Sequence, residues 1–193
     1  MKLQELLNGL DYTLVQGSLD TEVVDIAYDS RKVQPGWAFV CIVGTNRDSH
    51  DYAMDVAGQG ASVLVIEHKL DEVPQGVTVV QVESSRRALA LLSCNYFGRP
   101  AEKLITIGVT GTKGKTTTAH MIHSVMNAGG HKCGIIGTNG VAYPGVNRAL
   151  VNTTPESYEL QKMFSEMLAA GCDSVVMEVS SQGLMMDRVT GIH

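Results

Sequence analysis

The apolar residues of this chain fall into short runs that alternate with amphipathic segments. The runs at residues 38–43, 62–66, 104–109 and 174–178 are rich in apolar and β-branched side chains. Such runs are typical of strands buried on both faces of a sheet. We also expect strands at residues 23–28, 77–82 and 132–136.

Helical periodicity appears between these runs. It predicts helices at residues 51–59, 85–97, 116–128 and 156–170. Strands and helices that alternate in this order predict an α/β fold with mostly parallel sheets and helices on their faces. Ligands of such sheets bind at the carboxyl ends of the strands.

A short segment with Gly98 and Pro100 interrupts the pattern between a predicted helix and a predicted strand. We therefore predict two domains, at residues 1–98 and 99–193. The length of 193 residues is compatible with two small domains.

Composition narrows the function classes. The chain has 15 Lys and Arg against 20 Asp and Glu, and this net charge of -5 lacks the basic excess of nucleic-acid-binding proteins. No run approaches the ~20 apolar residues of a membrane span. The first residues show no apolar signal core, so we expect a cytoplasmic protein. The four cysteines are widely spaced, and we interpret them as buried thiols.

The strongest motif lies between the predicted strand 104–109 and the helix that follows it. Its glycines permit close approach of the backbone to phosphate, and N–H groups at a helix start attract anions. Lys115 is expected to contact the β- and γ-phosphates of a nucleotide, and the Thr116 hydroxyl to ligate Mg²⁺. The glycines of this loop lie closer together in the sequence than those of the common phosphate loop. This shorter spacing indicates a subgroup of the phosphate-loop proteins. The predicted ATP-binding residues are Gly111, Thr112, Lys113, Gly114, Lys115, Thr116 and Thr117.

A carboxylate supports this motif independently. Glu178 ends the apolar run at residues 174–178. In phosphate-loop enzymes an acid at the tip of a neighbouring strand helps to hold Mg²⁺. We therefore predict Thr116 and Glu178 as metal ligands, and Lys115 and Glu178 as the catalytic residues.

Together with three other segments, these motifs resemble the Mur ligase family, and within it the MurE type. The resemblance covers nearly all of the chain in order and spacing. It is carried by Asp29-Ser30-Arg31 with Pro35-Gly36, residues 111–117, Asn152-Thr153-Thr154-Pro155, and Glu178-Val179-Ser180-Ser181 with Arg188-Val189. It implies a small N-terminal α/β domain that binds a uridine nucleotide, followed by an incomplete phosphate-loop central domain with a mostly parallel sheet.

The resemblance also implies an activity. Such ligases use ATP and Mg²⁺ to add a third amino acid, diaminopimelate or lysine, to UDP-N-acetylmuramoyl-L-alanyl-D-glutamate in peptidoglycan synthesis. The reaction proceeds through an acyl phosphate. The uridine nucleotide is expected at Tyr28, Ser30, Thr45, Asn46 and Arg47. The muramoyl-peptide and diphosphate parts are expected at Asn152, Thr153, Thr154, Ser180 and Arg188.

Some positions depart from the family pattern. Lys113 stands where the family often has Asn, and Gln182 where many members have His. Met186 replaces a substrate-contacting Gln, so we exclude it from the site.

Family members are more than twice as long and have three domains. We therefore expect a fragment that is inactive alone and lacks the C-terminal domain that recognises the incoming amino acid. The alternatives are a folylpolyglutamate-type ligase, a small-molecule kinase and a non-catalytic nucleotide-binding module.

Overall fold

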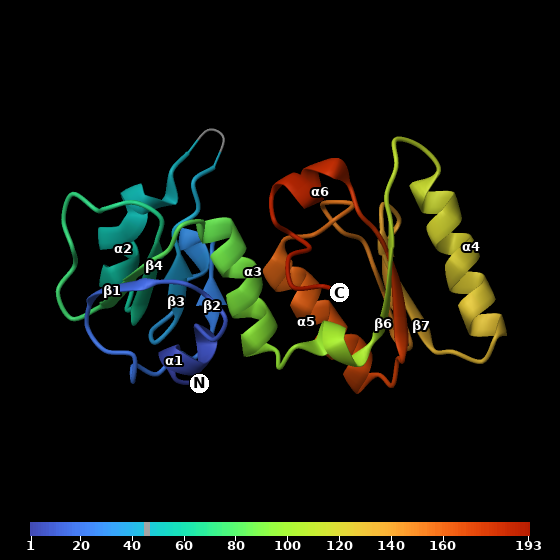
Figure 1. Ribbon diagram of the computed structural model, residues 1–193, viewed down its shortest axis with the longest axis horizontal. Helices are drawn as coiled ribbons and strands as arrows, with labels where there is room; N and C mark the ends of the chain where they lie inside the picture. The colour runs from blue at the N-terminus through green and yellow to red at the C-terminus, as the bar shows by residue number, and fades with distance from the viewer. Residues whose placement is uncertain (45–46) are drawn as a thin grey trace. The chain divides into compact units, whose positions relative to one another are not determined.

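The computed structural model describes residues 1–44 and 47–193. It divides into two compact units, Met1–Tyr96 and Phe97–His193. Figure 1 shows each unit as a sheet flanked by helices. The confirmed fold class is α/β, with parallel strands at the centre of each sheet.

Unit 1 contains a five-stranded sheet in the order β1-β5-β4-β3-β2. Strands β2 to β5 run parallel, whereas β1 pairs antiparallel with β5 at the edge. The strands are β1 (Thr13–Gln16), β2 (Ile26–Ala27), β3 (Ala38–Val40), β4 (Val63–Ile66) and β5 (Thr78–Gln81). The helices are α1 (Leu3–Leu6), α2 (Ala53–Gly58) and α3 (Ser85–Tyr96), with short 3-10 turns at Ser30–Lys32 and Ser49–Tyr52.

The core of unit 1 follows from the apolar runs. Phe39 and Leu64 are fully buried on one side of the sheet, in a cluster with Val56 of α2. Helix α3 contacts β3 and β4 and carries its own buried stripe, which includes Leu89 and Leu92. The Ser84 hydroxyl accepts the Arg87 N–H and caps this helix, as its position in the sequence predicts.

Unit 2 contains a second sheet in the order β6-β10-β7-β8-β9. The first three strands in this order are parallel, and β7, β8 and β9 form an antiparallel meander. The strands are β6 (Ile105–Val109), β7 (Cys133–Gly137), β8 (Gly140–Tyr143), β9 (Val146–Arg148) and β10 (Ser174–Glu178). The helices are α4 (Lys115–Ala128), α5 (Ser157–Ala169) and α6 (Ser181–Met185), and a 3-10 turn spans Pro100–Lys103.

Helices α4 and α5 cover opposite faces of this sheet (Figure 1). On the α4 side, Ala119 packs against Ile135 and Val176. On the α5 side, Phe164 packs with Ile136 and other buried side chains. All four cysteines are buried free thiols, as the sequence predicts.

The register of the parallel strands determines where along the sheet the candidate functional groups lie. Glu178 of β10 pairs with Val109 of β6, and Met177 pairs with Ile136 of β7. The three strands therefore end at the same edge of the sheet. Glu178, the loop after β6 and the residues after β7 all emerge there.

In the part of the chain that the structure describes, no helix is long and apolar enough to cross a bilayer.

Candidate functional site

The loop between β6 and α4 is built for close approach of an anion. Gly111 has φ +146° and Gly114, the N-cap of α4, has φ +80°. Both values lie where side chains beyond glycine are disfavoured. The helix begins at Lys115, so its first N–H groups face the loop. The loop from Thr110 to Gly114 is exposed.

Lys115 lies over this loop. Its ammonium donates to the Gly111 carbonyl, with 2.7 Å between Nζ and O. A neutral carbonyl is a weak partner for a cation compared with a phosphate oxygen. The amine can therefore exchange this contact for a phosphate without breaking an ion pair.

Thr116 and Glu178 meet at the base of the loop. The Thr116 hydroxyl donates to Glu178 Oε2 at 2.9 Å, and the Glu178 residue is only 2% exposed. A hydroxyl and a carboxylate are hard oxygen donors of the kind that Mg²⁺ prefers. Neighbouring oxygens in an octahedral Mg²⁺ shell lie about 2.9 Å apart, since each is ~2.0–2.1 Å from the ion. The donor set and the spacing both fit Mg²⁺.

The loop at residues 152–154 reaches the same edge of the sheet. Thr154 is buried, and its hydroxyl donates to the Glu178 carbonyl and accepts the Ser180 N–H. The hydroxyl of Thr153 lies 3.1 Å from that of Thr138. Asn152 is exposed. Ser180 caps the short helix α6 by accepting the Gly183 N–H.

Arg188 contacts the loop at residues 152–154. Its guanidinium donates to the Thr154 carbonyl and pairs with Glu156 at 2.6 Å. The Arg188 Nε is buried and has no hydrogen-bond partner among the described residues. The side chain is only 10% exposed. It is therefore held in place while part of its donor capacity is left over.

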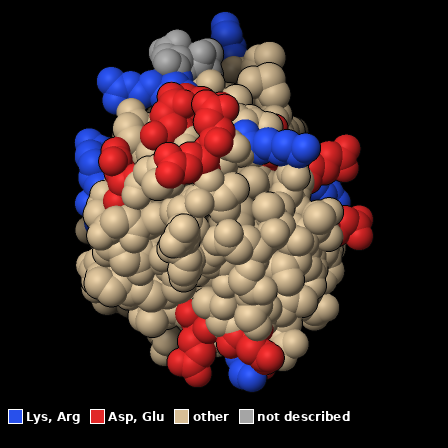
Figure 2. Space-filling model, turned by 90° about the vertical axis from the view of Figure 1, so that its left-hand side faces the viewer, with Lys and Arg blue, Asp and Glu red and all other residues tan. Residues whose placement is uncertain are grey.

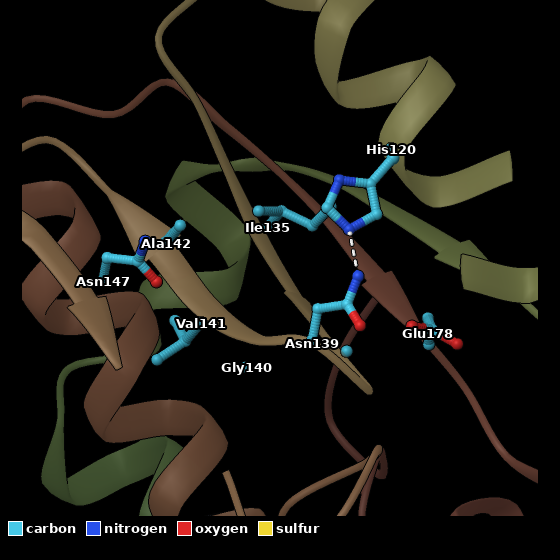
Figure 3. A pocket seen from close by; sticks show the side chains of 9 residues that line it. His120, Ile135, Asn139, Gly140, Val141, Ala142, Asn147 and Glu178 are labelled. Atoms are coloured by element: carbon cyan, nitrogen blue, oxygen red, sulfur yellow. Dashed lines mark hydrogen bonds between the residues drawn. The ribbon is translucent and has the colours of Figure 1, made fainter. Parts of the chain in front are cut away.

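A shallow pocket lies beside Glu178 on the α4 side of the sheet (Figure 3). His120 of α4 and Asn139 of the β7–β8 turn point toward one another there, and the Asn139 amide nitrogen lies 3.1 Å from His120 Nε2. The walls include Ile135 and Asn147. Neither of these polar side chains is predicted at the site from the sequence.

Thr138 is a residue that the sequence analysis missed. Its N–H donates to Glu178 Oε1 at 2.8 Å. It follows directly after β7, a strand that the sequence does predict. The rule that ligands gather at the carboxyl ends of parallel strands was the signal that could have found it.

In unit 1, the segment from Tyr28 to Arg31 forms a tight turn at the end of β2. Asp29 accepts the Arg31 N–H and a two-pronged ion pair from the Arg31 guanidinium, which lowers the pKa of Asp29 to about 2. Ser30 lies between the two members of this ion pair, at the start of a 3-10 turn. Arg47 is exposed. Thr45 and Asn46 lie outside the described residues.

Figure 2 shows the face of unit 1 that lies on the left of Figure 1. Most of this face is uncharged. The charged side chains gather in the upper part of this face, at its sides and at its lower edge.

Asp48, His50 and His68 also cluster in unit 1, with possible ligand atoms within 4.8 Å of one another. The buried His50 ring accepts the Glu67 N–H at Nε2, so its proton is on Nδ1, 2.5 Å from Asp48 Oδ1. A metal ion at Nδ1 would have to displace that proton. This tautomer therefore argues against a metal centre.

His68 stacks on His50 with 3.8 Å between ring centroids. Its Nε2 faces Asp48 Oδ2 at 2.7 Å and its Nδ1 faces the Lys69 carbonyl at 3.2 Å. Both partners are acceptors, so both contacts are satisfied only by the protonated ring. The hydrogen bonds to Asp48 and to the Lys69 carbonyl raise the pKa of His68. For Asp48, burial acts to raise the pKa, but hydrogen bonds from His50 and His68 outweigh it and lower the pKa to about 2.

These shifts predict a pH dependence of unit 1. A raised folded pKa gives stability that is present below the ordinary value of about 6.5 and is lost as pH rises through the folded pKa. The free energy of unfolding should therefore fall between pH 6 and pH 8, by less than ~1 kcal/mol because the His68 ring is half exposed. Urea unfolding followed by fluorescence of Trp37, the single tryptophan, measures this.

His68→Gln should remove that pH dependence. His131→Gln, in unit 2, is the control and should leave the Trp37 signal as in the wild type. An unchanged pH dependence in His68→Gln would contradict the assignment of a protonated ring.

The sequence of this chain is similar to those of known ligases. Residues 109–193 match the Mur ligase middle domain. Over its whole length the chain is 44% identical to the UDP-N-acetylmuramoyl-L-alanyl-D-glutamate--2,6-diaminopimelate ligase of Clostridium perfringens, and it spans 40% of that protein.

Two solved structures share the fold. A UDP-N-acetylmuramoyl-L-alanyl-D-glutamate--2,6-diaminopimelate ligase superposes with a TM-score of 0.81 at 22% identity, covering 99% of this chain and 38% of that one. A MurF ligase from Thermotoga maritima, solved in complex with ADP, superposes with a TM-score of 0.54 at 24% identity, covering 83% and 32%. The chain therefore spans about 40% of the length of the two diaminopimelate ligases and 32% of that of the MurF ligase.

Proposed function

Because this chain belongs to the Mur ligase family, we propose that it is the amino-terminal part of an ATP-dependent ligase that adds the third amino acid to UDP-N-acetylmuramoyl-L-alanyl-D-glutamate. One structural observation carries the proposal furthest. The glycine-containing loop between β6 and α4, a buried carboxylate and the threonine-containing loop 152–154 converge at one edge of the sheet in unit 2. We place this reaction in the cytoplasm, as a step of peptidoglycan synthesis.

In the proposed reaction, the D-glutamate carboxylate attacks the γ-phosphorus of ATP and ADP leaves. The amine of diaminopimelate or lysine then attacks the acyl phosphate carbon, and phosphate leaves. The first step brings several anionic groups together, so the site must supply positive charge. Residues 111–117 bind the triphosphate through backbone N–H groups, and the Lys115 ammonium moves from the Gly111 carbonyl to a phosphate oxygen.

Thr116 and Glu178 are the residues that would hold Mg²⁺. The ion, when bound, neutralises phosphate charge during transfer. Near them, Asn152, Thr153, Thr154, Ser180 and Arg188 hold the muramoyl-peptide and diphosphate parts of the substrate. The contact of Arg188 with the Thr154 carbonyl supports this assignment, because it places a guanidinium, which suits carboxylate and phosphate oxygens, beside this loop. Tyr28, Ser30, Thr45, Asn46 and Arg47 bind the uridine nucleotide.

Calorimetric titration of the chain with UDP-N-acetylmuramoyl-L-alanyl-D-glutamate tests the substrate assignment. UDP-glucose is the control, because it shares the uridine diphosphate but lacks the muramoyl peptide. Saturable binding that is much tighter than that of UDP-glucose supports the proposal. Equal affinities for the two compounds would count against recognition of the muramoyl peptide by this chain.

Ser30→Ala tests the uridine part of the site. The substitution removes one hydroxyl on an exposed turn, so the affinity for the UDP-linked substrate should fall about tenfold, as expected when a hydrogen bond to a charged group is lost. The affinity for ATP should not change. Calorimetry with each ligand measures both values, and Ser49→Ala, on the other 3-10 turn of unit 1, is the matched control. Unchanged binding of the UDP-linked substrate by Ser30→Ala would exclude this contact.

A further inference from the structure

The Glu178 carboxylate is held by more than the phosphate-loop threonine. Both of its oxygens accept hydrogen bonds from Thr138. The Thr138 N–H donates to Oε1 at 2.8 Å, and the Thr138 hydroxyl lies 3.3 Å from Oε2 as a donor. Thr116 donates to Oε2 from the other side. The carboxylate is therefore held by two neighbours, Thr116 in the first turn of α4 and Thr138 directly after β7.

Gly137, the residue before Thr138, leaves room for this arrangement. A Cβ atom on Gly137 would overlap the Glu178 carboxylate, because the carboxylate lies directly against the Gly137 backbone. Gly137 is also the last residue of β7, so the N–H of Thr138 is free of the sheet and points at the carboxylate. A residue without a side chain followed by a hydroxyl residue suits this packing.

The Thr138 hydroxyl has a second neighbour. It lies 3.1 Å from the hydroxyl of Thr153, which belongs to the loop at residues 152–154. Since Thr138 donates its single proton to Glu178, Thr153 must donate to Thr138. The result is a chain of hydrogen bonds from the 152–154 loop through Thr138 to the carboxylate.

We propose that Thr138 is a positioning residue that orients the Glu178 carboxylate toward a divalent cation and couples it to the 152–154 loop. This inference rests on the proposed function, because that function gives Glu178 its metal. Hydrogen-bond partners of a metal-ligating carboxylate fix its orientation, and their loss commonly weakens metal binding by about 10–100-fold. Thr138 is exposed, so its hydroxyl does not serve to fill the core.

Thr138→Val separates the hydroxyl from the rest of the residue. Valine keeps the shape of the side chain and the backbone N–H, which still donates to Glu178 Oε1. Only the hydrogen bonds of the hydroxyl, to Glu178 Oε2 and to Thr153, are lost. Thr138→Ser restores the hydroxyl without the methyl group. Thr106→Val, on β6 of the same sheet, is the matched control for replacing a partly exposed threonine.

The measurement is binding of Mn²⁺ to the 193-residue chain in the presence of adenylyl imidodiphosphate, followed by electron paramagnetic resonance. Thr138→Val should weaken Mn²⁺ binding about tenfold. Thr138→Ser should come within about twofold of the wild type, and Thr106→Val should match it. Thr153→Val combined with Thr138→Val should weaken binding no further than Thr138→Val alone, because both remove the same chain of hydrogen bonds.

Glu178→Gln separates the failure of this inference from that of the proposed function. If the wild type binds Mn²⁺, Glu178→Gln does not and Thr138→Val behaves as the wild type, the positioning role is wrong and the metal site stands. If the wild type fails to bind Mn²⁺ with the nucleotide, or Glu178→Gln binds it equally well, both the metal assignment and the role of Thr138 are overturned.

Discussion

Replacing Lys115 with alanine is expected to slow phosphoryl transfer by the complete ligase at least about 10²–10³-fold. The loop leaves the ammonium on a neutral carbonyl, from which it can move to the phosphate oxygens. Without it, the transfer of a phosphoryl group to a carboxylate loses a cation at the point where negative charge accumulates. ADP formed in a single turnover with the UDP-linked substrate measures this step.

Lys132→Ala is the control for the loss of one positive charge. Lys132 is exposed and precedes β7, at the opposite end of that strand from the proposed site. The rate of phosphoryl transfer by Lys132→Ala should equal that of the wild type. A Lys115→Ala enzyme with wild-type turnover would show that the loop after β6 does not bind the transferred phosphate.

Phe164→Ala is expected to lower the free energy of unfolding of unit 2 by about 3–5 kcal/mol. The ring is fully buried in the cluster between α5 and the sheet, so its removal leaves a cavity that the packed neighbours fill only in part. Hydrogen exchange of peptides from α5 and β10 in increasing urea measures the loss.

Phe39→Ala provides the matched substitution in unit 1, where Phe39 is equally buried. Trp37 directly precedes β3, the strand that contains Phe39, and packs against the same cluster, so its fluorescence reports that loss. If Phe164→Ala left the exchange of α5 and β10 unchanged, the packing of α5 on this sheet would be wrong.

Much of the fold could be predicted because its central strands are buried on both faces. The run at residues 174–178 has three consecutive apolar side chains at its centre and became β10 with the same bounds. Helix α4 was predicted to begin at residue 116 and begins at Lys115. These elements have a strong local pattern that agrees with their tertiary surroundings.

The missed elements lack such a pattern. Strand β1 is an edge strand with a bulge, and three of its four residues are exposed. Strands β8 and β9 are only four and three residues long, and neither contains a long apolar run. The Pro144-Gly145 turn between them was a hairpin signal, and Gly145 has φ +81° there. The predicted strand at residues 23–28 shrinks to Ile26–Ala27 because Val23 and Val24 lead into the sheet without joining it.

For the site, sequence could point to residues but not to their partners. Lys115, Thr116 and Glu178 lie next to recognisable strand and helix signals, so their place at one sheet edge followed from the topology. The contacts of Glu178 with Thr138, and of Arg188 with Glu156, depend on side chains from separate elements that meet only in the fold. Their roles in binding remain predictions.

The pairing of β6 with β10 also determines which insertions would displace Glu178. Glu178 stands opposite Val109, and the loop that leads from β6 to α4 follows immediately. One extra residue within β10 would shift Glu178 by about 3.3 Å along the strand and turn its side chain to the other face. The same residue added at the Pro144-Gly145 turn would lengthen an exposed hairpin and leave Glu178 where it is. Natural length variation in this unit should therefore collect at the hairpin and spare β6 and β10.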